Sequence, residues 1–139
     1  MTNRPVSAQY KKLIAEARKA KKNSHAPYSN FHVGAALLTA SGKIFTGSNI
    51  ENSSFSLTIC AERTAFFKAY SEGSRRFKAV AIVSDSADFI PPCGACRQVM
   101  MDLAGNIDII ITNGNGDIIV EKLSTLLPMA FDQHYLITK

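Results

Sequence analysis

The three cysteines of the chain are spaced so that they could bind one metal ion. Cys60 stands in a Cys-x-Glu triplet, and Cys93 and Cys96 form a Cys-x-x-Cys pair after two prolines. Zinc readily takes thiolate ligands, and such a pair supplies two of them on one tight turn. A structural zinc site normally has four protein ligands, whereas a catalytic site keeps one position free. Three cysteines therefore favour a catalytic metal site.

Glu62 lies two residues after Cys60, close enough to face the free position on such a metal. A carboxylate there can take a proton from water at the metal and pass it to a leaving group. A glutamate in the first turn of a helix can also do no more than complement the helix dipole. The spacing from Cys60 is what makes Glu62 the candidate acid and base.

Two other interpretations of the cysteines are possible. A Cys-x-x-Cys pair at a helix start also occurs in thioredoxin-like redox proteins, but that interpretation leaves Cys60 and Glu62 without a role. A non-catalytic zinc-stabilised interaction domain would need a fourth protein ligand. His25, His32 and His134 are not at ligand spacing from any cysteine, so we expect them in loops or at the surface.

Hydrophobic patterning predicts the elements that must hold these residues. A single domain is expected over residues 1–139, which have 46% hydrophobic content. Strands followed by crossover helices imply an α/β fold, a three-layer α/β/α sandwich with a mixed five-stranded sheet. Phe66, Phe67 and Tyr70 recur at helical spacing and are expected in the core. The predicted helices are 7–22 with Ser7 as its cap, 60–72, 94–103 and 123–127, and the predicted strands are 31–39, 43–48, 77–84, 107–112 and 117–120.

The predicted helices place all three cysteines at helix N-termini, where N–H groups and the helix dipole favour thiolate over thiol. Three thiolates around Zn²⁺ leave a net charge near −1, which weakens the ability of the metal to acidify water. A nearby cation should compensate. Arg63 and Arg97 both follow motif residues, and either guanidinium could donate to a ligand sulfur. Arg97 could equally form an ordinary ion pair on the helix surface.

The positive charge of the chain is concentrated at one end. The formal net charge is +5, and residues 1–22 alone carry +6. These basic positions alternate with Leu13, Ile14, Ala17 and Ala20, so a solvated helix face is expected, with no nucleic-acid partner. No apolar run approaches the ~20 residues that span a bilayer, and residues 1–10 lack a signal core. Free thiols suit a reducing compartment, and we expect a cytoplasmic protein without a membrane partner.

The motifs together resemble one known family. Cys-x-Glu followed by Pro-Cys-x-x-Cys is the zinc nucleoside and nucleobase deaminase signature, with cysteine where some relatives use histidine. The chain is similar to the short-chain, homotetrameric cytidine deaminases of pyrimidine salvage over residues 10–131. The segments that carry the resemblance are Ala26–Phe31, Val33–Leu38, Asn49–Asn52, Cys60–Ala65 and Cys93–Gln98.

This resemblance implies an enzyme that hydrolyses cytidine and deoxycytidine to uridine and deoxyuridine and releases ammonia. It implies zinc on the three cysteines, Glu62 as the catalytic residue and Arg63 as the donor to ligand sulfurs. It also implies a homotetramer with a composite active site, since Phe131 resembles an aromatic residue that reaches the base in a neighbouring subunit. The other implied substrate contacts are Phe31 stacked on the pyrimidine, Asn49 and Glu51 on the 3′-hydroxyl of the sugar, and the backbone at Ala61 on the base edge.

Two departures from the family pattern are mild. Ser24 and His25 stand where an aromatic residue often precedes the Ala-Pro-Tyr-Ser loop, and Phe55 stands where tyrosine is common. A same-fold deaminase could instead act on an aminonucleoside antibiotic or on a base within RNA. Asn49 and Glu51 and the absence of a basic substrate channel argue against both alternatives. The preference between cytidine and deoxycytidine stays open.

Overall fold

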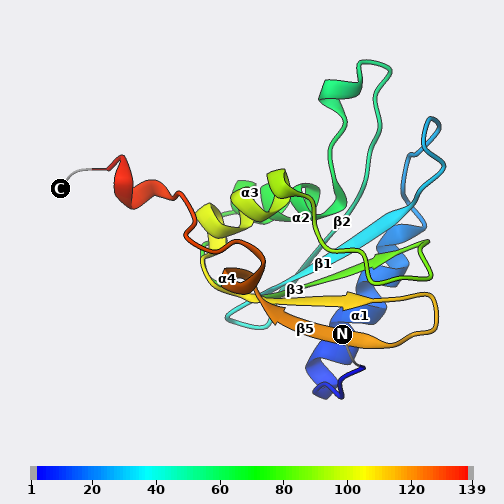
Figure 1. Ribbon diagram of the computed structural model, residues 1–139, viewed down its shortest axis with the longest axis horizontal. Helices are drawn as coiled ribbons and strands as arrows, with labels where there is room; N and C mark the ends of the chain where they lie inside the picture. The colour runs from blue at the N-terminus through cyan, green and yellow to red at the C-terminus, as the bar shows by residue number, and fades with distance from the viewer. Residues whose placement is uncertain (1–2, 138–139) are drawn as a thin grey trace.

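A computed structural model describes residues 3–137 of the chain. Its centre is a five-stranded sheet with the order β2-β1-β3-β4-β5 (Figure 1). The parallel pair is β3 and β4, and the other neighbouring strands are antiparallel, so the sheet is mixed. The strands are β1 (Val33–Thr39), β2 (Ile44–Ser48), β3 (Phe77–Ser84), β4 (Asp108–Thr112) and β5 (Ile118–Lys122).

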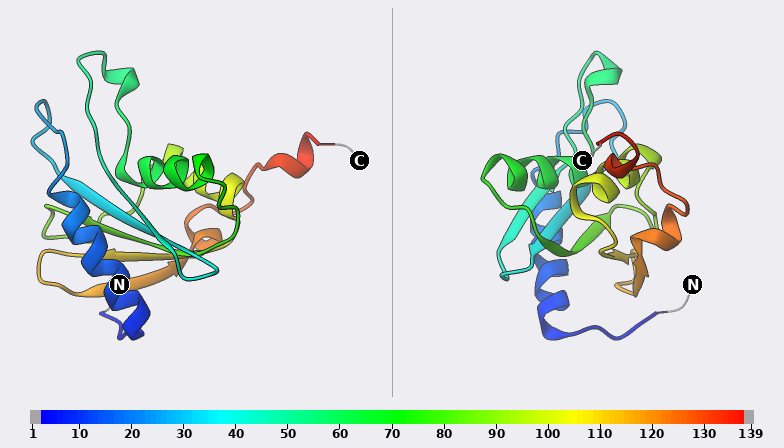
Figure 2. Two further views of the ribbon diagram at one scale, coloured as in Figure 1. Left: turned by 180° about the vertical axis from the view of Figure 1, so that it is seen from behind. Right: turned by 90° about the vertical axis from the view of Figure 1, so that its left-hand side faces the viewer.

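Helices cover both faces of this sheet (Figure 2). The predicted three-layer α/β/α sandwich is confirmed, and every predicted helix and strand is present within about two residues of its expected ends. Two short 3₁₀ helices, η1 (Phe55–Leu57) and η2 (Gln133–Tyr135), were not predicted. The α-helices are α1 (Ala8–Lys21), α2 (Ala61–Ser71), α3 (Gly94–Ala104) and α4 (Leu123–Leu126).

Alternation along β1 separates two hydrophobic cores. Ala35 and Leu37 pack in the core shared with α2 and α3. Ala36 and Leu38 point to the other face and pack against the apolar side of α1. Both faces of the strand are therefore buried, which explains why its sequence is a continuous apolar run.

The hairpin strand β2 lets the start of α2 approach the sheet closely. A Cβ atom at Gly47 would lie 2.4 Å from the carbonyl oxygen of Ala61 and 2.6 Å from the backbone nitrogen of Ala65. Glycine at this position thus removes the side chain that would push the first turn of α2 outward. The position of Cys60 and Glu62, which flank Ala61, depends on this close contact.

The three aromatic residues of α2 do not all enter the core. Phe66 is fully buried, and the half-buried Tyr70 donates its hydroxyl to the carbonyl oxygen of Leu103 at 2.8 Å. Phe67 is 46% exposed, so the prediction that it packs in the core is wrong. Successive residues on a helix are about 100° apart, so Phe66 and Phe67 cannot both face the sheet.

Two long connections project together from the cysteine-bearing end of the sheet (Figure 1). They are residues 22–32, between α1 and β1, and residues 49–60, between β2 and α2. Isolated bridges join His25 to Ile50 and Ile50 to Ile59, so the two connections support one another. The ends of the predicted domain, residues 1–2 and 138–139, lie outside the described residues, and the single domain stays a prediction. No helix in the described range is long and apolar enough to cross a membrane.

Candidate metal centre

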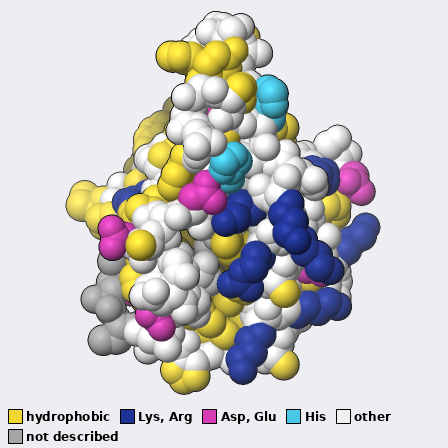
Figure 3. Space-filling view, turned by 90° about the vertical axis from the view of Figure 1, so that its right-hand side faces the viewer, with side chains coloured by type: hydrophobic (Ala, Val, Ile, Leu, Met, Phe, Trp, Pro, Cys, Tyr) yellow, Lys and Arg dark blue, Asp and Glu magenta, His cyan; other side chains and the backbone are white. Residues whose placement is uncertain are grey.

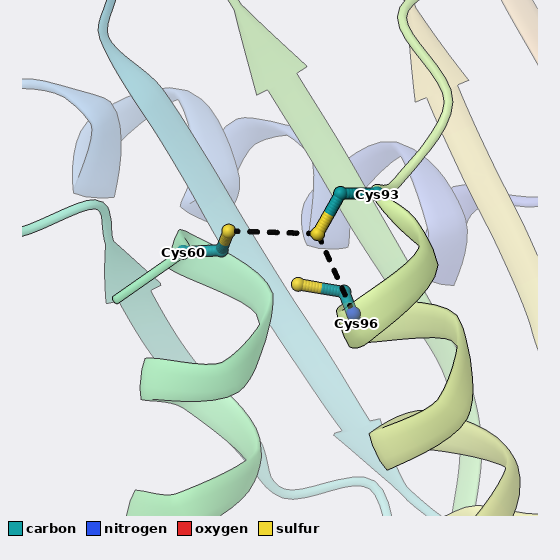
Figure 4. Close-up of side chains that lie close together, drawn as sticks. All are labelled: Cys60, Cys93 and Cys96. Atoms are coloured by element: carbon teal, nitrogen blue, oxygen red, sulfur yellow. Dashed lines mark hydrogen bonds between the residues drawn. The ribbon is translucent and has the colours of Figure 1, made fainter. Parts of the chain in front are cut away.

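The three cysteines converge at the ends of two neighbouring helices (Figure 4). Cys60 caps the N-terminus of α2, Cys93 caps that of α3, and Cys96 lies in the first turn of α3. Their sulfur atoms all lie within 4.8 Å of one another, and the Sγ atoms of Cys60 and Cys93 are 3.8 Å apart. The predicted placement at helix N-termini is confirmed, and the three residues form a group that could hold a metal ion.

The surroundings of the sulfurs favour a negative charge on Cys60. A hydrogen bond from the Cys96 thiol, with further hydrogen bonds from Arg63 and Cys93, lowers the pKa of Cys60 to about 5, although burial acts in the opposite direction. The hydrogen bond to Cys60 and burial both raise the pKa of Cys96. Cys93 also accepts the backbone N–H of Cys96 at 3.5 Å. A thiolate stabilised in this way is the form of cysteine that binds metal.

Of the two arginines considered, Arg63 is the one that contacts a sulfur. Its Nη2 atom donates to the Sγ atom of Cys60 at 3.3 Å, and this contact raises the pKa of the guanidinium. Its Nε atom is buried and has no hydrogen-bond partner within the described part of the chain. A guanidinium in this position withdraws negative charge from the sulfur, which is the compensation expected beside three thiolates.

Arg97 has a different role from both predicted ones. Its Nε atom donates to the carbonyl oxygen of Pro92 at 2.8 Å, and its Nη1 atom donates to that of Leu126 at 2.7 Å. Leu126 ends α4, where unpaired carbonyl groups attract a cation. Arg97 therefore joins the start of α3 to the end of α4, and among residues 3–137 it neither donates to a sulfur nor forms a surface ion pair.

Glu62 lies beside the cysteines and is almost completely buried, with 4% of its surface exposed. Burial raises the pKa of its carboxyl to about 7, and the negative charge on Cys60 adds to this effect. A carboxyl group that titrates near neutral pH can both accept and donate a proton. The position and the environment of Glu62 thus suit an acid and base.

A cavity of about 280 Å³ opens next to Glu62 and the cysteines. Phe31, Asn49, Glu51 and Ala61, which the sequence proposed as substrate contacts, all line it. Motif spacing alone did not identify several further residues that line the cavity. The predicted strand 77–84 could have indicated two of them, Ile82 and Ser84, because residues two positions apart on a strand face the same side of the sheet. The lining also includes Cys60, Glu62, Cys93, Ser29, Val33 and Ile90.

Phe131 is the one proposed substrate contact that does not line this cavity. It lies after α4, is 56% exposed and stacks on Tyr135 with 5.6 Å between the ring centroids. Its carbonyl oxygen accepts a hydrogen bond from Nε2 of Gln98 at 2.6 Å, which ties this segment to α3. The ring is thus held at the surface of the chain.

Asn49 and Glu51 have most of their hydrogen-bonding groups engaged by the protein. The side-chain oxygen Oδ1 of Asn49 accepts from the Val33 N–H at 2.9 Å and from the Ser24 hydroxyl, and Nδ2 of Asn49 donates to the backbone carbonyl oxygen of Phe31. Oε1 of Glu51 accepts two backbone N–H groups, and Oε2 accepts the Ser29 hydroxyl. One N–H of Asn49 and one acceptor position of Glu51 remain.

The histidines have other surroundings. None of the three is in the cysteine group found among residues 3–137. His25 and His134 are exposed, and the ring of the half-buried His32 pairs with Asp85.

A match to a family model identifies the protein family of this chain. The model of the cytidine and deoxycytidylate deaminase zinc-binding region matches residues 7–112, which is most of the chain. The chain belongs to this deaminase family. The matched region includes Cys60, Glu62, Cys93 and Cys96, so the family's zinc-binding function agrees with the metal centre described here.

Individual members of the family are similar over nearly the whole chain. A cytidine deaminase of Sporosarcina psychrophila is 52% identical over 126 residues, covering 90% of this chain and 93% of that protein. A cytidine deaminase of Halalkalibacterium halodurans is also 52% identical, over 86% of this chain and 91% of the relative. The crystal structure of a cytidine deaminase from Burkholderia pseudomallei is 48% identical, with a TM-score of 0.85, and covers 88% of this chain and 98% of that one.

Proposed function

We propose that the protein catalyses the zinc-dependent hydrolytic deamination of cytidine and deoxycytidine to uridine and deoxyuridine, with release of ammonia. The observation that carries this proposal is the position of Glu62, which is buried beside three convergent cysteine sulfurs and lines the same cavity as Cys60 and Cys93. Membership of the deaminase family and the names of the relatives support the same reaction.

In this proposal Cys60, Cys93 and Cys96 hold the zinc ion. When bound, zinc supplies Lewis acidity that makes water a nucleophile at neutral pH. Glu62 takes a proton from the attacking water and protonates N3 of the cytosine ring, which makes C4 electrophilic. After the water oxygen has added to C4, Glu62 takes the second proton from the resulting C4 hydroxyl and delivers it to the 4-amino group. The carbon–nitrogen bond then breaks, ammonia leaves, and the C4 carbonyl of uridine remains. Arg63 offsets the charge of the thiolates through its contact with Cys60.

The walls of the cavity hold the nucleoside. Phe31 stacks on the pyrimidine, and backbone at Ala61 contacts the edge of the base. Asn49 and Glu51 share the 3′-hydroxyl of the sugar, since a hydroxyl both accepts and donates and each side chain has one complementary group left. This arrangement does not involve the 2′ position, so both cytidine and deoxycytidine are substrates.

Ultraviolet absorbance tests the reaction directly. Purified zinc-loaded protein should convert cytidine to uridine, and a chelator should abolish the conversion until zinc is restored. Absence of conversion of cytidine and deoxycytidine under zinc-replete conditions would contradict the proposed function. Conversion of a cytosine-containing aminonucleoside antibiotic in their place would favour the alternative deaminase.

Sugar recognition gives a second expected result. 3′-Deoxycytidine should have a kcat/KM about 10- to 100-fold below that of 2′-deoxycytidine, because the missing hydroxyl leaves the free N–H of Asn49 and the free acceptor of Glu51 unpaired beneath the bound nucleoside. Glu51→Gln should reduce this difference, since its amide oxygen can still accept the backbone N–H groups of Tyr28 and Ser29 while the free acceptor is lost. Equal kcat/KM for the two deoxynucleosides would remove Asn49 and Glu51 from sugar binding.

We also propose a homotetramer in which Phe131 completes the site of a neighbouring subunit. Phe131 is exposed and lies outside the cavity of its own chain, and other large apolar side chains are exposed as well. Exposed apolar groups of this kind are typical of subunit interfaces. Phe55, Leu57, Phe67 and Met129 belong to this set.

Replacement of Phe131 tests this composite site. Phe131→Ala should raise KM for cytidine about 10-fold and leave zinc content unchanged, because an aromatic contact is lost away from the metal. Sedimentation of the wild-type protein should give a tetramer. A fully active monomer, or an unchanged KM in the variant, would rule out the composite site.

The proposed partner is a free nucleoside, and we propose a cytoplasmic location. Lys and Arg side chains gather on the face that carries α1 (Figure 3). This helix packs on the opposite side of the sheet from α2 and α3, which carry the cysteines. The basic face is thus separated from the cavity. A reducing compartment would keep the three thiols available for zinc, and cell fractionation tests the location.

A further inference from the structure

The carboxylate of Asp85 connects the two chain segments just beyond the last backbone pair of β1 and β3. Val33 and Ser84 are the outermost partners of this ladder, and His32 and Asp85 are the next residues outward. One oxygen of Asp85, Oδ2, accepts the backbone N–H of His32 at 2.8 Å and lies 2.6 Å from Nδ1 of its ring. The other, Oδ1, accepts from Nζ of Lys21 at 3.1 Å.

The neighbours of this pair line the proposed substrate cavity. Phe31, Val33 and Ser84 contribute to its wall, whereas His32 and Asp85 do not. Side chains alternate along an extended segment, so a contact that holds the backbone of His32 also sets the direction of Phe31. Asp85 can thus act on the wall of the cavity without touching its occupant.

Few other contacts hold the backbone at Phe31. Its N–H donates to the Ser29 hydroxyl at 3.0 Å, and its carbonyl oxygen accepts from Nδ2 of Asn49 at 2.8 Å. The preceding residue, Asn30, has a φ of 55°, in the left-handed region. The segment therefore enters β1 through a turn, and Asp85 is the side chain that holds it to β3.

The negative charge of Asp85 strengthens its contact with His32. Partial burial would raise the pKa of Asp85, but hydrogen bonds from the backbone and ring of His32 and from Lys21 lower it to about 2. The carboxylate thus stays ionised across the physiological range. Arg18 lines the same surface hollow as Lys21 and Asp85 and adds a further positive charge on that side.

We propose that Asp85 is a positioning residue that acts through His32 to hold the Phe31 ring against the pyrimidine. The inference rests on the proposed function, because it takes a pyrimidine nucleoside as the occupant of the cavity. The Phe31 ring contacts the base, and Asp85 limits the orientations that this ring can adopt. Loss of Asp85 should therefore weaken stacking and leave the proton transfers of Glu62 intact.

A double-mutant cycle separates this role from a general structural one. Competitive inhibition by uridine, whose ring is planar, is compared with inhibition by 5,6-dihydrouridine, whose ring is not aromatic. Asp85→Ala should raise the Ki of uridine about 3- to 10-fold, change that of dihydrouridine less than about twofold, and leave zinc content unchanged. KM for cytidine should rise while kcat stays within about threefold.

Phe31→Leu should show the same pattern, and the double variant should match Phe31→Leu alone, because Asp85 acts through that ring. Effects that multiply in the double variant, or equal weakening of both inhibitors, would overturn the proposal. Asp88→Ala is the control, since Asp88 is an exposed residue of the same loop and its backbone N–H, which the substitution keeps, donates to the Ser86 hydroxyl.

Asp85→Asn keeps the test decisive if the alanine variant does not fold. Its amide oxygen can still accept from His32, but it carries no charge for Lys21, so a smaller change in the same direction is expected. No change in uridine binding would overturn the proposal. A wild-type protein that neither deaminates cytidine nor binds uridine would refute the proposed function itself, whereas multiplying effects in an active enzyme would refute only the role of Asp85.

Discussion

Glu62→Gln is expected to lower kcat for cytidine by about 10²–10⁴-fold or more while the fold and the zinc content are retained. The amide is nearly the same size as the carboxyl and fits the same buried position, which has 4% exposure. It can form hydrogen bonds, but it cannot carry protons between water and the base. The measurement is steady-state deamination of cytidine, with zinc content and thermal unfolding measured on the same samples.

Glu72→Gln is the matched control for this substitution. Glu72 caps the opposite end of α2 and is exposed, so the same chemical change there should leave kcat unaltered. If Glu62→Gln kept more than about a tenth of the wild-type kcat, Glu62 would not be the acid and base. A loss of zinc from the variant would point to a structural role for the carboxyl.

Replacement of any one of Cys60, Cys93 and Cys96 by alanine is expected to remove most of the bound zinc and, with it, the activity. The chain has only these three cysteines, so no other thiol can substitute. Two thiolates hold a zinc ion much more weakly than three, and the free energy of metal binding also stabilises the folded chain. Atomic absorption should show zinc well below one ion per chain in each variant, and thermal unfolding should shift to lower temperature.

Chelation and reconstitution of the wild-type protein provide the control for the cysteine variants. Zinc removal should reproduce their lower thermal stability, and added zinc should restore it in the wild type but not in the variants. Full zinc occupancy in any single variant would contradict a site with three thiolate ligands. Cys96→Ala also removes a fully buried side chain, so part of its loss of stability will persist without metal.

The helices, strands and the cysteine group were predictable because the signals that specify them are local. Apolar periodicity, Ser7 as a helix cap and the loop glycines each depend on a few consecutive residues. The cysteine motifs lie at the starts of α2 and α3, which follow β2 and β3, the two strands on either side of β1, and which pack in the same core on one face of the sheet. The placement of Cys60 and Cys93 therefore followed from the order of the elements.

The partners of individual side chains depended on tertiary structure. Arg97 reaches a carbonyl 29 residues away, and His32 pairs with a carboxylate 53 residues away, so no local spacing relates either pair. Phe67 is exposed because the rotation of α2 on the sheet buries Phe66.

By itself, the sequence determined the set of thiols that could bind a metal ion, the carboxyl beside them and the order of the elements, because these are properties of residue type and local spacing. Only the tertiary structure decided which groups line the cavity and which side chains hold its walls. Asn49 and Glu51 show the difference, since their types suggested hydrogen bonding but only the folded chain shows how much of that capacity the protein uses. Contacts between distant segments result from the packing of the whole sheet and its helices, which no short stretch of sequence specifies.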